Sequence, residues 1–333
     1  MNQFLQRIDA KKQQLDSYRP LPPELVKNLD DWFRVELTYT SNAIEGNTLS
    51  RQETALVVEK GLTVAGKSLR EHLEAINHAQ ALDFIGSLVA KPRQELSENE
   101  ILDIHNLILQ SIDNLNAGRY RRVSVRIAGS TTVLPNWAKV PDLMSAFYDW
   151  LHSTADIHPV LLAADAHYKF VSIHPFVDGN GRTARLLMNL LLMQEGYPPA
   201  LIRKEDRLRY INSLEQAQLD GSLTDYYQVI CEAVERSLDI YLEALEPAVM
   251  ASPEQAIPKL LKIGELAKAT GESAPTLRFW TQSQLLQVAG VTPGGYQLFA
   301  PAMIQRIQLI RRLQQEQRLS IDEIRQRLVV NAL

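Results

Sequence analysis

Apolar residues recur at helical spacing along most of the chain, which predicts a mainly helical protein. Helices are expected at residues 24–45, 101–110, 141–153, 159–170 and 224–246. A longer apolar run at 186–193 is followed by Gly196 and two prolines, which is typical of a buried helix with a glycine C-terminal cap. Residues 123–127 alternate apolar and polar and, with Val133 and Leu134, predict a small β-hairpin.

Prolines and turn signals divide the chain into parts. Three prolines between residues 247 and 258 indicate a linker. The expected parts are an N-terminal helical region at 1–94, a core at 95–246, the linker at 247–258 and a C-terminal unit at 259–333. Within the last unit the pattern predicts, in order, a helix and turn over 263–271, a short helix from residue 274, a tight turn at 292–296 followed by a short strand, and helices at 301–317 and 320–328.

Ser50 and Ser97 each begin a capping box, with a glutamate three residues later, and each predicts the start of a helix. Between them, residues 61–68 fit the phosphate-binding pattern GxxxxGK(S/T) letter for letter. That pattern needs a buried strand before it, whereas residues 52–60 are charged and helical. We therefore interpret residues 61–68 as a turn between two helices.

The composition is ordinary for a globular protein, with 45% hydrophobic and 22% charged residues among 333. Cys231 is the single cysteine, so no internal disulfide can form and a reducing compartment is expected. The start resembles no signal peptide and no apolar run reaches membrane-spanning length, so we expect a cytoplasmic protein with no membrane partner. The net charge is −4, yet residues 259–333 carry ten basic and five acidic residues, which suggests an anionic partner for that unit.

A polar cluster precedes the apolar run, in the stretch from His174 to Arg185. It lies at the N-terminal end of the predicted buried helix, where free N–H groups and the helix dipole favour an anion. Gly179 and Gly181 let the backbone approach a phosphate closely. Arg182 and Arg185 lie three residues apart, on one helix face, where both can bind phosphate oxygens. The pattern predicts a polyphosphate site with a base beside it; a buried histidine and a structural glycine turn are the alternative.

This stretch resembles the signature HPFx(D/E)GNGRxxR of the Fic family (filamentation induced by cAMP) at every fixed position. The resemblance implies that His174 is the general base and that Asp178 holds Mg²⁺. It implies transfer of AMP from ATP to a Ser, Thr or Tyr hydroxyl of a target protein, and of the chain itself. The residues implied to bind the ATP phosphates are Gly179, Asn180, Gly181, Arg182 and Arg185.

Two further segments resemble the family. Ser41 and Glu45 match its inhibitory motif, (S/T)xxxE(G/N), whose glutamate pairs with the second arginine of the signature, here Arg185. An ordinary surface helix that ends in a carboxylate and a glycine is the alternative. Asn212 lies in a segment similar to the one that borders the adenosine site. The predicted hairpin takes the place of the family's flap, which holds a target by main-chain pairing, although a plain structural hairpin is also possible.

The C-terminal unit resembles the winged helix-turn-helix of MerR-type regulators in its segments IGELA, TLRFW and GGY. The resemblance implies that Thr276 and Arg278 face duplex DNA and that the wing at Tyr296 lies along its backbone. Lys268 and Arg306 are candidate phosphate contacts. The chain stops at Leu333 without the long dimerising helix of such regulators, so DNA binding would require a homodimer formed by the Fic part. A protein-contacting module is the alternative.

Other activities fit the same residues. A sibling enzyme could transfer another phosphate-containing group or remove AMP, and a DNA-binding regulator could use the Fic part only to sense ATP. A zinc enzyme is not indicated, because His152, His158 and His167 lack any zinc-ligand spacing.

Overall fold

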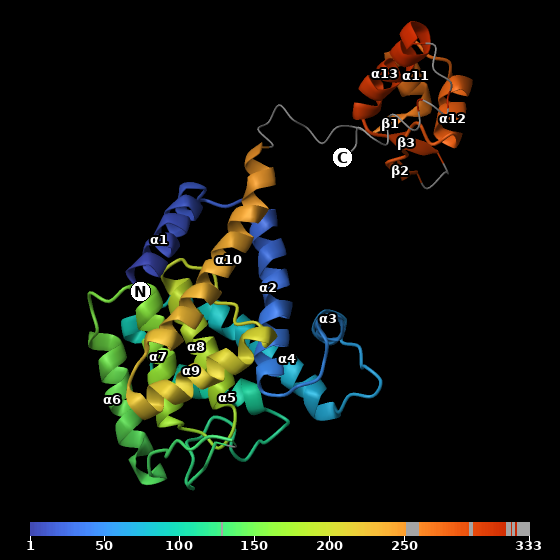
Figure 1. Ribbon diagram of the computed structural model, residues 1–333. Helices are drawn as coiled ribbons and strands as arrows, with labels where there is room; N and C mark the ends of the chain where they lie inside the picture. The colour runs from blue at the N-terminus through green and yellow to red at the C-terminus, as the bar shows by residue number, and fades with distance from the viewer. Residues whose placement is uncertain (128, 251–259, 293–295, 318–320, 322–323, 325–333) are drawn as a thin grey trace. The chain divides into compact units, whose positions relative to one another are not determined.

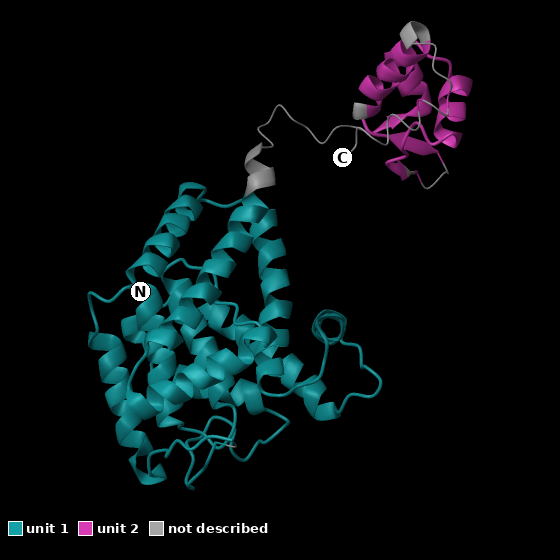
Figure 2. Ribbon diagram, in the orientation of Figure 1, with its two compact units in different colours: residues 1–246 teal, residues 247–333 magenta. Residues whose placement is uncertain are grey.

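The structure, a computed structural model, describes residues 1–333 except 128, 251–259, 293–295, 318–320, 322–323 and 325–333. The chain forms two compact units, residues 1–246 and 247–333 (Figure 2). Each unit has its own buried apolar core, the first built around helices α5, α7, α8 and α10 and the second around Trp280 and Phe299.

The regular elements of unit 1 are all helices within the described residues (Figure 1). The helices are α1 (Asn2–Ser17), α2 (Pro23–Ile44), α3 (Arg51–Lys60), α4 (Leu69–Leu88), α5 (Glu98–Leu109), α6 (Val140–Ser153), α7 (Pro159–Ile173), α8 (Asn180–Gln194), α9 (Arg207–Asp220) and α10 (Thr224–Met250). Three short 3-10 turns, η1 (Arg93–Glu95), η2 (Trp137–Lys139) and η3 (Lys204–Asp206), lie between them. The helices predicted from apolar spacing are confirmed, with ends shifted by a few residues.

Helix α8 is the centre of unit 1, as its apolar run predicts. It packs against α4, α5 and, most extensively, α7. The side chains from Leu186 to Leu192 are buried, and each large apolar one stabilises the fold by roughly 1.5–3 kcal/mol when it leaves water. Gly196 has φ +73° just beyond the helix, as expected of a glycine C-terminal cap. A helix that is buried on all sides holds its N-terminal end in a fixed place, and that end carries the polar cluster.

The two helix starts that were predicted from capping boxes are confirmed. Ser50 and Ser97 form complete capping boxes with Glu53 and Glu100. Residues 61–68 join α3 to α4 without any strand, so the interpretation as a helix–helix turn is confirmed. Within this turn the Val64 amide donates to His72 Nε2 at 2.8 Å, which makes His72 a structural residue.

The predicted hairpin is not formed as a strand pair. The structure assigns no strand to residues 119–136, Ala128 lying outside its description. A turn does form, with the Ser130 amide donating to Ile127 O at 3.2 Å. The two segments on either side of this turn are joined at their base by a side chain and not by backbone hydrogen bonds between strands. Arg121 donates to the carbonyls of Val123 and Pro135 at 3.1 and 2.7 Å. We keep the name flap for residues 119–136.

The linker was expected to begin at residue 247, which is also where the second compact unit begins. Helix α10 nevertheless continues to Met250. The predicted helix ended at residue 246 because Pro247 has no backbone N–H to donate within a helix. The rest of the predicted linker, 251–258, lies outside the described residues.

In unit 2 the first three predicted helices and the strand after the predicted turn are present, together with two short strands that were not predicted. Its helices are α11 (Ile263–Thr270), α12 (Ala274–Gln282) and α13 (Ala302–Gln317). A small antiparallel sheet has the order β1 (Leu261–Lys262), β3 (Gln297–Phe299) and β2 (Gly290–Val291). Ser273 caps α12 through the Thr276 amide, and Pro275 stands in its first turn. Most of the helix predicted at 320–328 lies outside the described residues.

Across the part of the chain that the structure describes, we find no helix long and apolar enough to cross a membrane.

Candidate active site

The candidate site is the loop that joins α7 to α8, residues 174–179. His174 ends α7 in a left-handed conformation, with φ 53° and ψ 60°, and Gly179 precedes α8 with φ +78°. The Asn180 side chain holds the loop closed, because its oxygen accepts from the Phe176 amide and its nitrogen donates to the Phe176 carbonyl, both at 2.9 Å. Both polar groups of Asn180 are therefore used inside the loop. Its backbone N–H and the second N–H of its amide group remain for the phosphate role that was predicted for it.

Two residues that the sequence analysis did not single out, His105 and Arg121, support this loop. His105 on α5 stacks flat on Phe176, with ring centroids 3.5 Å apart, and its Nε2 donates to the Asp178 carbonyl at 3.0 Å. Its Nδ1 accepts from the Gly118 amide, which assigns the proton to Nε2. A side chain at Gly179 would lie 3.2–3.3 Å from the His105 ring, so glycine also allows this close packing.

Arg121 ties the flap to the same loop. It is buried, and its Nε donates to the His174 carbonyl at 2.8 Å, while its backbone amide donates to Pro175 O at 2.9 Å. Its other guanidinium nitrogens hold the two arms of the flap. A buried guanidinium whose donors all meet carbonyl oxygens fixes the distance between flap and loop.

His174 is placed to act as a base. Burial lowers the pKa of His174 below the ordinary value of 6.5 and is the largest effect; a hydrogen bond with the Val171 backbone opposes it, and the positive charge of Arg121 adds to it. The imidazole is therefore neutral at pH 7, which is the form that accepts a proton.

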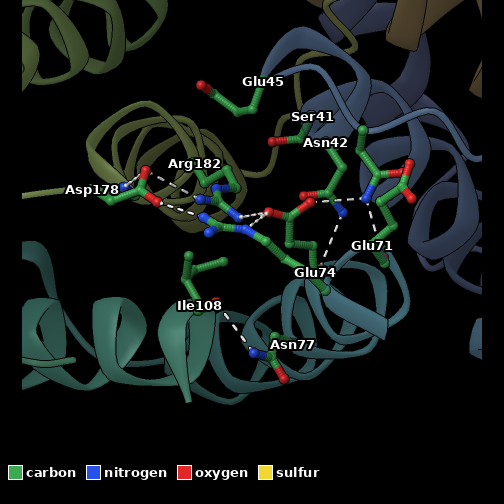
Figure 3. Close-up of polar contacts among 12 residues, drawn as sticks. Ser41, Asn42, Glu45, Glu71, Glu74, Asn77, Ile108, Asp178 and Arg182 are labelled. Atoms are coloured by element: carbon green, nitrogen blue, oxygen red, sulfur yellow. Dashed lines mark hydrogen bonds and ion pairs between the residues drawn. The ribbon is translucent and has the colours of Figure 1, made fainter. Parts of the chain in front are cut away.

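Arg182 is buried between two carboxylates (Figure 3). Its Nη2 lies 3.4 Å from Asp178 Oδ1 and its Nη1 lies 3.6 Å from Glu74 Oε1. Arg70 on α4 joins the same group, donating to Glu74 Oε1 at 3.2 Å and to Asp178 Oδ2 at 3.0 Å. Neither Arg70 nor Glu74 was predicted as part of the site. The four alternating charges hold the Asp178 side chain at the mouth of the loop, where it remains about half exposed.

Arg185 is paired with α2, as the resemblance implied. Its Nε donates to Ser41 Oγ at 3.0 Å, and its Nη2 donates to Ser41 O at 3.0 Å and to Glu45 Oε1 at 2.7 Å. The Arg185 side chain is 6% exposed and that of Glu45 is 38% exposed. Their attraction raises the pKa of Arg185 against the effect of burial.

The Glu45 carboxylate also lies over the first turn of α8. A Cβ added to Gly181 would be 2.5 Å from Glu45 Oε1 and 3.0 Å from Arg185 Nη1. Glycine at this position therefore makes room for the carboxylate. Glu45 occupies the end of α8 where free N–H groups and the helix dipole favour an anion.

The remaining predicted residues are placed as follows. Asn212 is exposed on α9, whereas Glu215 and Gln218 of the same helix reach toward the site: Glu215 accepts from Ser130 Oγ at 2.7 Å in the flap, and Gln218 donates to Ser172 Oγ at 3.3 Å. Around the helix axis Asn212 lies about 60° from Glu215 and about 120° from Gln218, so it shares a face with the first and not with the second.

In unit 2, Lys268, Arg278 and Tyr296 are exposed and Thr276 is partly buried. Arg306 donates to the Leu285 carbonyl, at 2.6 Å, and so joins α13 to the turn that follows α12. Exposed aromatic surface accompanies the predicted contacts, since Phe279 next to Arg278 is 52% exposed and Tyr296 is 68% exposed.

The other histidines have structural partners. His152 bonds Leu96 O, and His158 caps α7 and contacts Asp9. Among the described residues, no group of three or more His, Cys, Asp or Glu side chains could hold a metal ion by itself.

Comparison with known proteins agrees with the two sequence resemblances. Residues 95–192 match the model of the Fic/DOC family, and residues 261–329 match that of the MerR HTH family regulatory protein. The chain is 36% identical over 269 residues to protein adenylyltransferase Fic of Culex quinquefasciatus, covering 80% of this chain and 52% of the relative. It is 42% identical over 211 residues to protein adenylyltransferase fic-1 of Caenorhabditis elegans, covering 62% and 41%. The chain thus spans about half the length of the curated relatives that it matches.

Solved structures share the fold of unit 1. A Fic-1 fragment from C. elegans has a TM-score of 0.67 and 34% identity, covering 74% of this chain and 73% of that chain. A Fic domain containing signaling protein from Bacteroides thetaiotaomicron has a TM-score of 0.67 and 31% identity, covering 72% and 98%.

Proposed function

The chain belongs to the Fic/DOC family, and on that premise, with the geometry of the α7–α8 loop, we propose that it transfers AMP from ATP to a hydroxyl side chain of a target protein. One observation carries the proposal. A neutral, partly buried His174 and two buried arginines converge on the N-terminal end of α8, where the structure already holds a carboxylate, that of Glu45. A base beside an anion site is what attack of a hydroxyl on a phosphate requires.

In the proposed reaction, His174 accepts the proton of a Ser, Thr or Tyr hydroxyl. The oxygen attacks the α-phosphorus, its new bond forms as the bond to the β-phosphate oxygen breaks, and pyrophosphate leaves. The Gly179–Gly181 turn, the free N–H groups of α8, Arg182 and Arg185 bind the phosphates. These groups act by orienting the nucleotide and by neutralising negative charge.

Mg²⁺ fits the residues present. Asp178 offers an exposed carboxylate beside the phosphate site, and Mg²⁺ is commonly bound by one or two carboxylates together with substrate phosphates. The scarcity of other ligands among the described residues suits this mode, because the phosphates supply most of the oxygen atoms. When bound, the ion would neutralise charge on the leaving group. To bind the ion through Oδ2, Asp178 would have to give up the hydrogen bond that this oxygen accepts from Arg70.

We propose further that Glu45 inhibits the chain. Its carboxylate shares the end of α8 with the site of the nucleotide phosphates and occupies a hydrogen-bonding position of Arg185. Helix α2 holds Glu45 in place through α4, because Asn42 donates to Glu74 O at 3.1 Å and Asn47 donates to Glu74 Oε2 at 2.9 Å.

Intact-mass analysis of the Glu45→Gly variant with Mg-ATP and candidate targets tests the reaction class. The expected result is an added mass of one AMP on the target or on the chain itself. An added phosphate would assign a sibling transfer reaction, and release of AMP from a modified target would assign the reverse reaction. Binding of ATP with no covalent product would favour a sensor.

The pH dependence of transfer is predicted from His174. Because burial lowers its pKa below 6.5, the base is neutral over a wider range of pH than an exposed histidine. We expect kcat/KM of the Glu45→Gly variant to be constant at neutral pH and to fall as the solution is acidified, with a midpoint below 6.5. Initial rates at saturating Mg²⁺ between about pH 5 and 8 measure this. A midpoint above 7 would contradict the assignment of a partly buried His174 as the base.

A second function, binding of duplex DNA by unit 2, is supported by the match at residues 261–329 and by the exposed Arg278 on α12. Proteins of this class use two copies on two half-sites. We therefore propose that DNA binding requires a dimer of the chain.

We expect the full chain to bind duplex DNA with an affinity that falls steeply as salt rises. Arg278→Gln should weaken binding and, if the guanidinium meets a phosphate, reduce the log–log salt slope by about one. Fluorescence anisotropy between low and physiological salt measures both. Arg7→Gln, an exposed arginine on α1, is the matched control and should change neither. Binding that does not respond to salt would favour a protein-contacting module.

A further inference from the structure

The two carboxylate oxygens of Asp178 have different surroundings. Oδ1 accepts from the Gly179 amide at 2.6 Å and lies 3.4 Å from Arg182 Nη2, so the loop and α8 already use this oxygen. Oδ2 accepts from Arg70 Nη2 at 3.0 Å, and within the described part of the chain it has no other hydrogen bond or ion pair. The oxygen that the loop leaves available to a ligand is therefore Oδ2, and Arg70 occupies it.

The charges around Asp178 are balanced. Arg70 and Arg182 contribute two positive charges, and Glu74 and Asp178 contribute two negative charges, with ion-pair distances of 3.0–3.6 Å. Figure 3 shows Arg182 between Glu74 and Asp178. A cation is attracted less by a carboxylate that an arginine already neutralises, and it is repelled by that arginine. A divalent ion alone therefore gains little here, whereas one that enters with nucleotide phosphates is accompanied by additional negative charge.

Arg70 can leave Asp178 without losing its other partner. Its Nε donates to Glu74 Oε1 at 3.2 Å, and Glu74 is itself held by Asn47, which donates to Oε2 at 2.9 Å. The Arg70 side chain is 60% exposed, so water can bond the donors that leave Asp178. Exposed ion pairs are weak, which makes this contact readily exchangeable.

We propose that Arg70 is an internal competitor of the divalent cation. Its guanidinium occupies Asp178 Oδ2 in the absence of nucleotide and disfavours binding of the free cation. It gives way when the cation enters with the phosphates of ATP. This inference rests on the proposed function and concerns the regulation of its metal site.

The main test measures binding of Mn²⁺ alone to the full chain, without nucleotide, by electron paramagnetic resonance. Mn²⁺ prefers the same oxygen ligands as Mg²⁺. Arg70→Gln should bind Mn²⁺ at least about threefold more tightly than wild type, which is the size expected for loss of a competing exposed ion pair. Adding Asp178→Asn to Arg70→Gln should remove this gain, because the oxygen that Arg70 releases is then no longer charged.

Two controls separate this exchange from a general effect of charge. Arg7→Gln removes an exposed arginine that is paired with Glu235 at 2.8 Å on another face, and it should leave Mn²⁺ binding unchanged. Arg70→Lys keeps the positive charge and should stay within about twofold of wild type. Thermal unfolding confirms that each variant is folded, and Arg70→Met replaces Arg70→Gln if the latter is not.

The second measurement is the dissociation constant of ATP by calorimetry in the Glu45→Gly background, with saturating Mg²⁺ and with EDTA. The ratio of the metal-free to the Mg²⁺ constant should rise at least about threefold on Arg70→Gln, since the ion no longer has a competitor.

No gain in Mn²⁺ affinity on Arg70→Gln, or a gain that persists with Asp178→Asn, would overturn the inference. An equal gain on Arg70→Lys would overturn it too, because the charge would not be what competes. If Asp178→Asn leaves binding of Mg-ATP unchanged in the Glu45→Gly background, the proposed metal site is wrong and the inference fails with it. If Asp178→Asn weakens Mg-ATP while Arg70→Gln changes neither measurement, the inference alone is overturned.

Discussion

Substitution of His174 is expected to abolish AMP transfer while ATP binding persists. In the Glu45→Gly background, loss of the base should lower kcat by about 10²–10⁴-fold. The phosphate-binding groups are the glycine turn and the two arginines, none of which bonds the imidazole of His174. The dissociation constant for Mg-ATP should therefore change by no more than about threefold, since the imidazole makes no contact that the phosphates need.

The choice of substitution matters, because His174 has φ 53°. A left-handed backbone strains most residues but is adopted more readily by asparagine. His174→Asn therefore removes the base with the least disturbance of the loop, and His174→Ala is the second variant. His152→Ala, which removes a histidine on α6, is the control and should transfer AMP at the parental rate. Undiminished transfer by both His174 variants would remove this residue from the mechanism.

Most of the helices and the central loop could be predicted from the sequence because their signals are local. The apolar spacing of α8, the capping boxes at Ser50 and Ser97, and the glycine after α8 each depend on residues within one or two helical turns. The pairing of Arg185 with Glu45 joins residues 140 positions apart and did not follow from such signals. It was predicted only because both motifs resemble one family.

What could not be predicted depends on contacts between distant segments. His105 stood in the apolar face of α5, and nothing nearby indicated that it stacks on Phe176. Arg70 and Glu74 meet Asp178 and Arg182 across about a hundred residues. The flap was predicted as a hairpin from alternation, but Arg121 bonds the carbonyls at its base. Short alternating segments are weak signals, because tertiary contacts readily override them.

Asn180 and Asn212 show how much a sequence motif leaves open about a site residue. Asn180 lies in the predicted loop, yet its amide is used in closing that loop around Phe176. A motif identifies the position of such a residue without saying whether its side chain or its backbone meets the ligand. Asn212 was assigned by similarity of a segment; its side chain is exposed, while Glu215 and Gln218 farther along α9 contact the flap and Ser172.

Removal of the Glu45 side chain is expected to activate the chain. A hydrogen-bonded pair with a charged partner contributes about 1.5–3 kcal/mol, and ATP must displace this pair to reach Arg185. The lower part of that range applies, because the Glu45 side chain is 38% exposed and partly screened by water. We therefore expect Glu45→Gly to raise the rate of transfer at subsaturating ATP by about tenfold or somewhat more. Incorporation of labelled AMP into target and chain measures the change.

Matched variants show whether the gain comes from the carboxylate at this position. Glu24→Gly introduces glycine at the other, exposed end of α2 and should leave transfer low. Glu45→Gln keeps the size of the side chain without its charge and should give an intermediate rate. Equal rates for wild type and Glu45→Gly would show that Glu45 does not inhibit.

The double variant decides between release of Arg185 and mere loosening of α2. Arg185 holds the end of α2 through Ser41 as well as Glu45, so both single substitutions weaken that contact. If inhibition worked only by holding α2 against the core, adding Arg185→Ala to Glu45→Gly would preserve or increase the gain. If Arg185 is needed for the γ-phosphate, the same addition should remove most of it and raise the KM for ATP. We expect the second result, since the guanidinium that Glu45 occupies lies at the end of α8, beside the phosphate site.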